Sequence, residues 1–339
     1  MEASFDLTIA WAVLISAAVF IYVALDGFDL GVGILHPFFS ERADRKLMMN
    51  TLAPVWDGNE TWLILGGGGL FAAFPLAYAV LMPALYLPVL LMLLALIFRG
   101  VAFEFHGRAS SRFYEKMWDA AFAGGSAFAA FAQGLILGGL LQGVEVEGRS
   151  FAGGALDWAT PFALLTGVAV MAGYALLGAC WLNIKTEGAL QMKARRAGRW
   201  LTLAVPAFLA AVSAATPFLE QEYAQRWFQW PAILLSGVMP LLVAVLAWNL
   251  WRALSPGAVR DWAAMLWALG LFLAAFAGLG ISIWPYVVPT EITIREAATP
   301  FYSQIFMFVG AVVLIPLILA YTAYAYWVFR GKTDAEGYH

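Results

Sequence analysis

Long apolar runs dominate this sequence, and their length strongly constrains the fold. Nine such runs fall near residues 8–34, 50–74, 77–100, 118–142, 160–183, 198–218, 230–251, 261–285 and 304–329. About 20 apolar residues in an α-helix suffice to cross a bilayer. Hydrophobic residues make up 63% of the chain and charged residues only 12%, about half of what a soluble domain carries. We predict an all-α polytopic membrane protein with nine transmembrane helices, forming a single integral membrane domain over residues 1–339.

The basic residues lie almost entirely on one side of this scheme. If the N-terminus is outside, 16 of the 19 Lys and Arg residues fall in inner loops or at inner helix ends, and the exceptions are Arg149, Arg226 and Arg295. Cytoplasmic loops of membrane proteins carry this excess. We therefore expect a periplasmic N-terminus and a cytoplasmic C-terminus. The opening residues MEASFDLTIAW lack Lys and Arg, so we expect a retained helix and not a cleaved signal peptide.

The second apolar run contains two acidic residues near its start. In WDGNETWLILGGGGLFAAFP, residues 56–75, Asp57 and Glu60 are three residues apart and share one face of a helix. A carboxylate within the bilayer costs roughly 2.5 to 3.5 kcal/mol, so this face should contact protein, and both acids are functional candidates. Stabilisation of the helix N-terminus by the helix dipole is the alternative role for either residue.

The first apolar run carries a second acidic pair. Asp26 and Asp29 lie in YVALDGFDLGVGIL, in the later part of the helix, where the dipole disfavours anions. Both pairs should lie roughly 10 to 15 Å inside the cytoplasmic face. That placement predicts a hydrated route for protons or ions. The glycines at 27, 31 and 33, and the run 66–69, predict close helix packing.

Basic residues and histidines gather at the cytoplasmic ends of the helices. In RGVAFEFHGR, residues 99–108, Arg99 or Arg108 can pair with the acids above, or both can belong to a belt at the lipid headgroups. His36 and His106 are peripheral, and the third histidine, His339, is the last residue. The chain therefore offers no buried histidine pair to ligate a haem. Cys180 lies in an apolar run, where we expect it to pack.

A weak internal repeat relates two distant segments. GISIWPYVVPTEI, ending the eighth run, echoes FAAFPLAYAVLMP at residues 71–83. This favours two four-helix bundles plus a ninth helix.

Several motifs, taken together in order, resemble those of one family. DGFDLGVG, WDGNETWLILGGGGLFAAFP and LIFRGVAFEF are joined by MWD at 117–119, LLQGV at 140–144, WPYVVP at 284–289 and TAYAYWVF at 322–329. This set resembles subunit II of the cytochrome bd-type quinol oxidases, in their cyanide-insensitive-like branch. The resemblance covers nearly the whole chain, and WDGN followed by a glycine run is its most specific part.

The resemblance implies membership of a respiratory terminal oxidase in the bacterial inner membrane, a quinol:O2 oxidoreductase. Such a complex oxidises ubiquinol or menaquinol and reduces O2 to water. Subunit I, the expected partner, would hold haems b558, b595 and d. The resemblance also allows a small single-helix subunit and a bound structural quinone or lipid, and we expect no nucleic-acid partner.

The resemblance also assigns roles to individual residues. Asp26 and Asp57 match the motif aspartates of a cytoplasmic proton path toward the haem d site, with Asp29 and Glu60 beside them. Trp62 matches a position on an apolar O2 route. Glu60 departs from the family pattern, where glutamine stands at this position, so its role transfers less directly.

Two other functions compete with the oxidase hypothesis. A stand-alone proton-coupled transporter could use the same acidic pairs, but it would need a midplane substrate site, often built from broken helices. The second half of the chain has no acidic residue deep in a helix. A purely structural scaffold for subunit I differs from the leading hypothesis in leaving Asp26 and Asp57 without a proton role.

Overall fold

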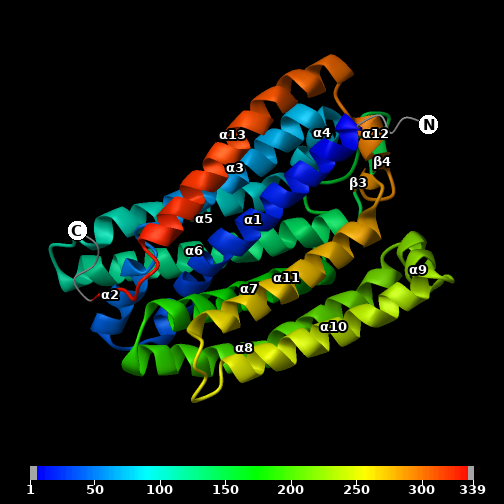
Figure 1. Ribbon diagram of the computed structural model, residues 1–339. Coiled ribbons are helices and arrows are strands. Elements are labelled where there is room, and N and C mark those ends of the chain that lie inside the picture. The colour runs from blue at the N-terminus through cyan, green and yellow to red at the C-terminus, as the bar shows by residue number, and fades with distance from the viewer. Residues whose placement is uncertain (1–5, 335–339) are drawn as a thin grey trace.

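The computed structural model describes residues 6–334, apart from the side chain of Leu235, and is almost entirely helical (Figure 1). In chain order its elements are α1 (Leu7–Leu35), η1 (His36–Phe38), α2 (Arg42–Asn50), α3 (Trp56–Ala73), α4 (Pro75–Ala84), α5 (Tyr86–His106), α6 (Arg112–Leu141), β1 (Val146–Glu147), β2 (Ser150–Phe151), α7 (Pro161–Lys185), α8 (Gly188–Ala215), η2 (Thr216–Phe218), α9 (Gln221–Phe228), α10 (Ala232–Ala253), α11 (Asp261–Ile283), β3 (Tyr286–Val288), β4 (Ile292–Thr293), α12 (Ile294–Ala297) and α13 (Phe301–Val328).

The membrane-spanning helices agree with the predicted fold class. Within the described residues, eight helices are long and apolar enough to cross a membrane, and the total is nine if the bent pair α3 and α4 counts as one span. The strands form two short antiparallel hairpins, β1 with β2 and β3 with β4. The chain is therefore a polytopic α-helical membrane protein, as predicted.

The predicted span 77–100 differs from the structure. The chain bends by 119° between α3 and α4, and the membrane helix that follows is α5, which begins at Tyr86 and continues to His106. Pro75 opens α4. Because proline disfavours helical backbone at the residue before it, α3 ends at Ala73 and Phe74 adopts a non-helical conformation. Composition alone did not locate this bend, since both sides of it are apolar.

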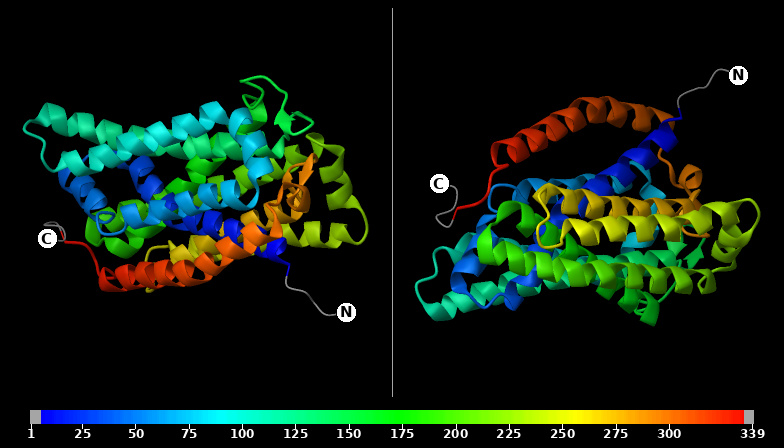
Figure 2. Two further views of the ribbon diagram at one scale, coloured as in Figure 1. Left: turned by 90° about the horizontal axis from the view of Figure 1, so that it is seen from above. Right: turned by 60° about the horizontal axis from the view of Figure 1, so that its bottom comes forward.

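The helices α1, α6 and α7 form the centre of the bundle. α1 packs against α3, α6 and α7, while α5 packs along α6, and α10 packs along α11. α7 packs as closely against α1 and α6 as against α8, so it joins the first four spans to the later ones. α13 lies along the edge of the molecule, mainly beside α1 (Figure 2). The acidic segment of α1 is thus enclosed by helices from both halves of the chain.

Glycine permits the close crossing of α1 and α7. A Cβ atom added to Gly31 would lie 1.8 Å from the carbonyl oxygen of Tyr174, and one added to Gly178 would lie 2.3 Å from the carbonyl carbon of Gly31. In α3, Gly66 and Gly69 face Val19 and Ile15 of α1, but Gly67 and Gly68 meet no atom within 4 Å. The predicted role of glycine in helix packing therefore holds in α1 and on one face of α3.

Candidate functional site

Arg99 is the centre of a buried charge cluster in the half of the membrane nearer the basic loops. Its Nη1 lies 2.7 Å from Asp26 Oδ1 and 3.4 Å from Glu60 Oε1, and its Nη2 lies 3.7 Å from Asp29 Oδ2. Arg99 has no exposed surface, so the alternative of a headgroup belt is wrong for this residue. A charge so buried requires partners of opposite sign, and three carboxylates supply them.

The two aspartates of α1 are positioned by helical spacing. Asp26 and Asp29 are three residues apart, so they project to the same side of α1, and neither has any exposed surface. Both face Arg99 of α5, one of the two arginines expected as partners of the acids. Arg108, the alternative partner, is exposed and lies 6.0 Å from the ring centre of Phe105.

A hydrogen-bonded chain connects this cluster to α13. Asn59 Nδ2 donates to Asp29 Oδ2 at 2.8 Å, and the Tyr326 hydroxyl donates to Asn59 Oδ1 at 2.8 Å. Asn59 is buried, with 1% of its surface exposed. Sequence reasoning missed both residues, although Asn59 belongs to the WDGN motif and Tyr326 to TAYAYWVF. A polar side chain within an apolar run was the available signal.

The two acids of α3 have different surroundings. The Glu60 side chain is 27% exposed and reaches Arg99, so it joins the buried cluster to the surface of the chain. Asp57 lies in the first turn of α3 and is exposed. Within residues 6–334, no hydrogen bond or ion pair joins Asp57 to Asp26. Glu60 and Asp26 share Arg99 as their ion-pair partner, whereas the proximity of Asp57 to Asp26 stays a prediction.

A second polar chain lies one helical turn farther from the basic loops. Tyr22 precedes Asp26 by one turn of α1, and Gln133 Nε2 donates to its hydroxyl oxygen at 2.8 Å. The Tyr174 hydroxyl donates to Gln133 Oε1 at 2.6 Å. These residues link α1, α6 and α7 and extend the polar interior beyond the carboxylates.

Several buried polar atoms of this region have no hydrogen-bond partner among the described residues. They are Asp26 Oδ2, Asp29 Oδ1, Glu60 Oε1, Trp62 Nε1, Arg99 Nε, Arg99 Nη2 and Ser126 Oγ. Buried polar atoms in proteins are ordinarily paired with protein or with internal water. The cluster is therefore chemically suited to bind water along its length.

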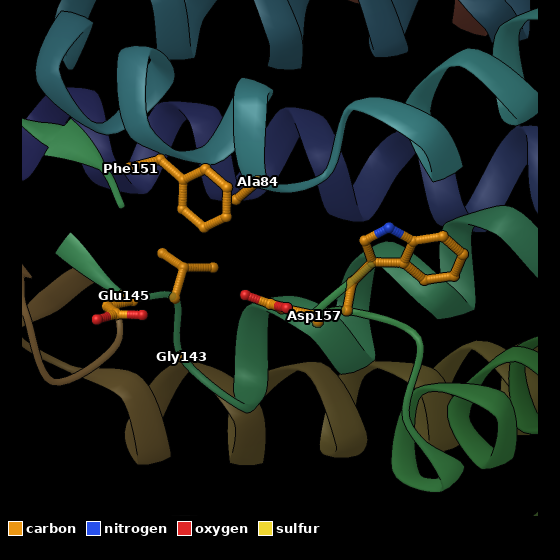
Figure 3. Close-up of a pocket in the computed structure, with 8 residues that line it drawn as sticks. Ala84, Gly143, Glu145, Phe151 and Asp157 are labelled. Atoms are coloured by element: carbon orange, nitrogen blue, oxygen red, sulfur yellow. The ribbon is translucent and has the colours of Figure 1, made fainter. Parts of the chain in front are cut away.

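A cavity on the opposite side of the membrane is separate from this cluster. It has a volume of about 50 Å³ and lies between the end of α6 and the β1–β2 hairpin, lined by residues including Phe151 and Asp157. These two side chains project toward one another in Figure 3. None of the residues around Arg99 lines this cavity, which is only large enough for one or a few water molecules.

Comparison with known proteins decides the family. The family described as cytochrome bd terminal oxidase subunit II matches residues 7–329. The chain belongs to this subunit II family.

Curated relatives match over almost their whole length. Cytochrome bd-I ubiquinol oxidase subunit 2 of Escherichia coli K12 is 29% identical over 367 residues, covering 96% of this chain and 95% of the relative. Cytochrome bd ubiquinol oxidase subunit 2 of Bacillus subtilis is 28% identical over 333 residues, covering 96% of each. The solved bd oxidase of Geobacillus thermodenitrificans has the same fold in a matching chain, with a TM-score of 0.75 at 16% identity, covering 96% of this chain and 99% of that one.

Cytochrome bd complexes contain haem, and haem iron is commonly held by histidine. His36 Nε2 and His106 Nε2 lie 3.5 and 3.0 Å from the same atom, Asp119 Oδ1, at the basic end of the bundle. Arg45 Nε lies 3.4 Å from the other oxygen of Asp119. Two imidazoles converging on one carboxylate do not fit a pair of axial ligands on opposite faces of a haem. His339 lies outside the described residues.

Trp62 of this subunit II lies inside the helix bundle. Its exposed fraction is 2%, and it packs with Ala18 and Tyr22 of α1. Cys180 is also buried, in the core around α7, which agrees with its predicted packing role.

Proposed function

We propose that this chain is the haemless subunit II of a bacterial bd-type oxidase that oxidises ubiquinol or menaquinol and reduces O2 to water. Subunit I would hold haems b558, b595 and d, and this chain would conduct protons from the cytoplasm toward it. The observation that carries the proposal is the cluster around Arg99, which is buried except where Glu60 reaches the surface. Family membership supports the oxidase assignment.

The charge balance of the cluster suits proton uptake. Three carboxylates surround one guanidinium, and an arginine side chain does not release its own proton in proteins. One positive charge cannot balance three negative charges in a site with little access to water, so a proton shared among the carboxylates lowers the electrostatic cost. Protons would reach Glu60 from the side of Asp57 and pass to Asp26 and Asp29, with Arg99 holding these carboxylates in place.

The exposed face of α3 is the proposed contact with subunit I. Its residues recur every three or four positions and so form one stripe along the helix. They are Asp57, Thr61, Ile64, Gly68 and Phe71. A carboxylate facing lipid is costly, and small residues favour helix association in membranes. Docking of subunit I here would cover Asp57 and place it beside the mouth of the proton path. Trp62, one residue beyond Thr61, would then border the proposed O2 route.

The transporter hypothesis has less support. The bent pair α3 and α4 is a broken span, which transporters often use at a midplane site. However, α3 has 18 residues and is about 27 Å long at 1.5 Å per residue, so it nearly crosses the membrane before the bend. The break therefore lies near the outer surface, away from the charge cluster.

The decisive experiment replaces Glu60 in the intact oxidase complex. Glu60→Gln keeps the size of the side chain but removes its proton-binding group. We expect quinol-driven O2 consumption to fall by at least tenfold, because a positioned proton-transfer group typically contributes about 10²-fold or more to the rate. Haem content and recovery of the larger subunit should stay near wild type. Glu104→Gln is the matched control, because Glu104 is an exposed carboxylate of α5 outside the cluster.

Asp57→Asn should resemble Glu60→Gln, and the double variant should be scarcely slower than either single one, because groups serving one path act as a unit. Wild-type turnover of Glu60→Gln at every pH from 5 to 9 would refute the proton path. A colourless chain purified alone, without a larger subunit, that transports protons would refute the oxidase assignment as well.

A further inference from the structure

A groove runs along the outside of α6 at the basic end of the bundle. Its volume is about 680 Å³, and its walls come from the end of α1, from η1, from α2, from α6 and from α7. Ala120, Ala123, Gly124 and Ala127 form its floor. Their spacing places them on one face of α6. These small side chains leave a shallow, apolar channel between the bulkier Phe38 and Met171.

Positive charge marks one end of this groove. Lys116 and Arg45 both line it, and both come from the loops and helix ends that carry most of the basic residues. Lys116 is exposed, while the Arg45 side chain is 26% exposed. Asp119, the acidic residue of the lining, is 3.0 Å from His106 and 3.4 Å from Arg45. The lining therefore retains an exposed cation at the end that faces the cytoplasmic headgroups.

Buried nitrogen atoms of the lining also lack hydrogen-bond partners. His36 is 1% exposed and lines the groove, yet within residues 6–334 its Nε2 has no hydrogen-bond partner and lies 3.5 Å from Asp119. Arg45 Nε is likewise without a hydrogen-bond partner among the described residues. Buried polar atoms normally have a partner, and the Nε–H of Arg45 can only donate, so this end of the groove is suited to a ligand that accepts hydrogen bonds.

The length of the groove matches one leaflet of a membrane. Lys116 and Ala127 are eleven positions apart on α6, which corresponds to about 16 Å along the helix axis. Half of the hydrocarbon core of a bilayer is about 15 Å thick. A molecule with an acidic headgroup at Lys116 and an extended acyl chain would therefore occupy the groove along its full length.

We propose that this groove binds an anionic phospholipid of the cytoplasmic leaflet. The phosphate lies at Lys116 and Arg45, and one acyl chain lies over Ala120, Gly124 and Ala127. Basic pockets between membrane helices on the cytoplasmic side bind acidic headgroups in this way. The proposal does not depend on the proton path, since the groove lining includes none of the residues around Arg99.

The test measures lipid retention by the intact complex. The complex is reconstituted in nanodiscs with equal amounts of phosphatidylglycerol and phosphatidylcholine, extracted in mild detergent and analysed by native mass spectrometry. We expect wild type to retain one phosphatidylglycerol at this site and Lys116→Gln to lower its retention by about tenfold, as for loss of a charged contact. Lys46→Gln is the control, because Lys46 is exposed on α2 and does not line the groove.

A second variant tests the acyl channel without changing charge. A Cβ atom at Gly124 would meet nothing within 4 Å, so Gly124→Leu should fold normally and fill the channel. We expect it to lose the lipid while Lys116 is intact. Four results would each overturn the proposal. They are equal retention of both lipids, a neutral quinone in the groove, a polypeptide of the partner covering the groove, and unchanged lipid retention in both variants.

Discussion

Arg99 Nη1 lies 2.7 Å from Asp26 Oδ1, and neither side chain has any exposed surface. The pair joins α5 to α1 across 73 positions of sequence. Removing one partner of a buried ion pair typically costs about 3 to 5 kcal/mol because the other charge is left without compensation. The two partners of this pair are not equivalent, since Arg99 also faces Asp29 and Glu60.

We predict that Arg99→Gln is more damaging than Asp26→Asn. Without Arg99, three carboxylates remain with no cation among them, and the loss of stability should reach the upper part of the about 3 to 5 kcal/mol range. After Asp26→Asn, Arg99 still has two carboxylate partners, so the loss should be smaller. Thermal unfolding of the purified complex and its recovery after detergent extraction measure the difference. Equal stability of the two variants would show that the cluster is not organised by Arg99.

Gly31→Ala should disrupt the packing of α1 against α7. The added methyl group would lie 1.8 Å from the backbone oxygen of Tyr174, so one of the two helices must move, at a cost near the upper end of about 1 to 3 kcal/mol. Gly310→Ala in α13 is the control, because a Cβ atom there meets nothing within 4 Å and alanine favours the helix. Detergent stability of the two variants checks the prediction, and a Gly31→Ala protein as stable as wild type contradicts it.

The orientation predicted from the basic residues can be tested with reporter fusions. Fusions after Ala43 and Gly188, and at the C-terminus, should report the cytoplasm, because these positions adjoin the loops and tail that carry 16 of the 19 basic residues. A fusion after Gly148, in the β1–β2 hairpin, should report the periplasm. A periplasmic signal at any of the first three sites, or a cytoplasmic signal after Gly148, would contradict the predicted topology.

The start of α1 should lose stability in acid. Asp6 caps this helix by accepting from the backbone N–H of Thr8 and Ile9, and it accepts from Arg295 Nη2 at 2.7 Å. The hydrogen bond from Ile9 and the pairing with Arg295 lower the pKa of Asp6 below its usual 3.8. A lowered folded-state pKa means that the cap stabilises the helix fully above the unfolded pKa and is lost as the pH falls through the folded one.

Hydrogen exchange at the amides of Thr8 and Ile9 measures this effect. After correction for intrinsic rates, protection in wild type should fall as the pH drops below about 4. Asparagine also caps helices but does not titrate, so Asp6→Asn should show protection that is independent of pH in this range. A wild-type profile that is flat down to pH 2 would contradict the role of the carboxylate.

The charge cluster shows how far the sequence predicted the site. Asp26 and Asp29 were candidates because charges are rare in these apolar runs, and both lie in the cluster. Glu60 joins the cluster through Arg99, whereas Asp57 is exposed in the first turn of the same helix. Spacing defines which residues share a face of one helix, but not how that helix is rotated toward its neighbours. Asn59 and Tyr326 escaped notice because a hydrogen bond across 267 positions leaves no local pattern.

The sequence by itself determined the helical membrane fold and the approximate positions of the spans, because a bilayer selects apolar length and each run meets that requirement independently. Only the tertiary structure decided that Arg99 is buried and paired, that α4 turns away from α3, and that α7 joins both groups of helices. These features depend on helix rotation and close approach, which are set by contacts such as Gly31 against Tyr174. Such contacts join residues distant in sequence, and their energies arise only once the helices pack together.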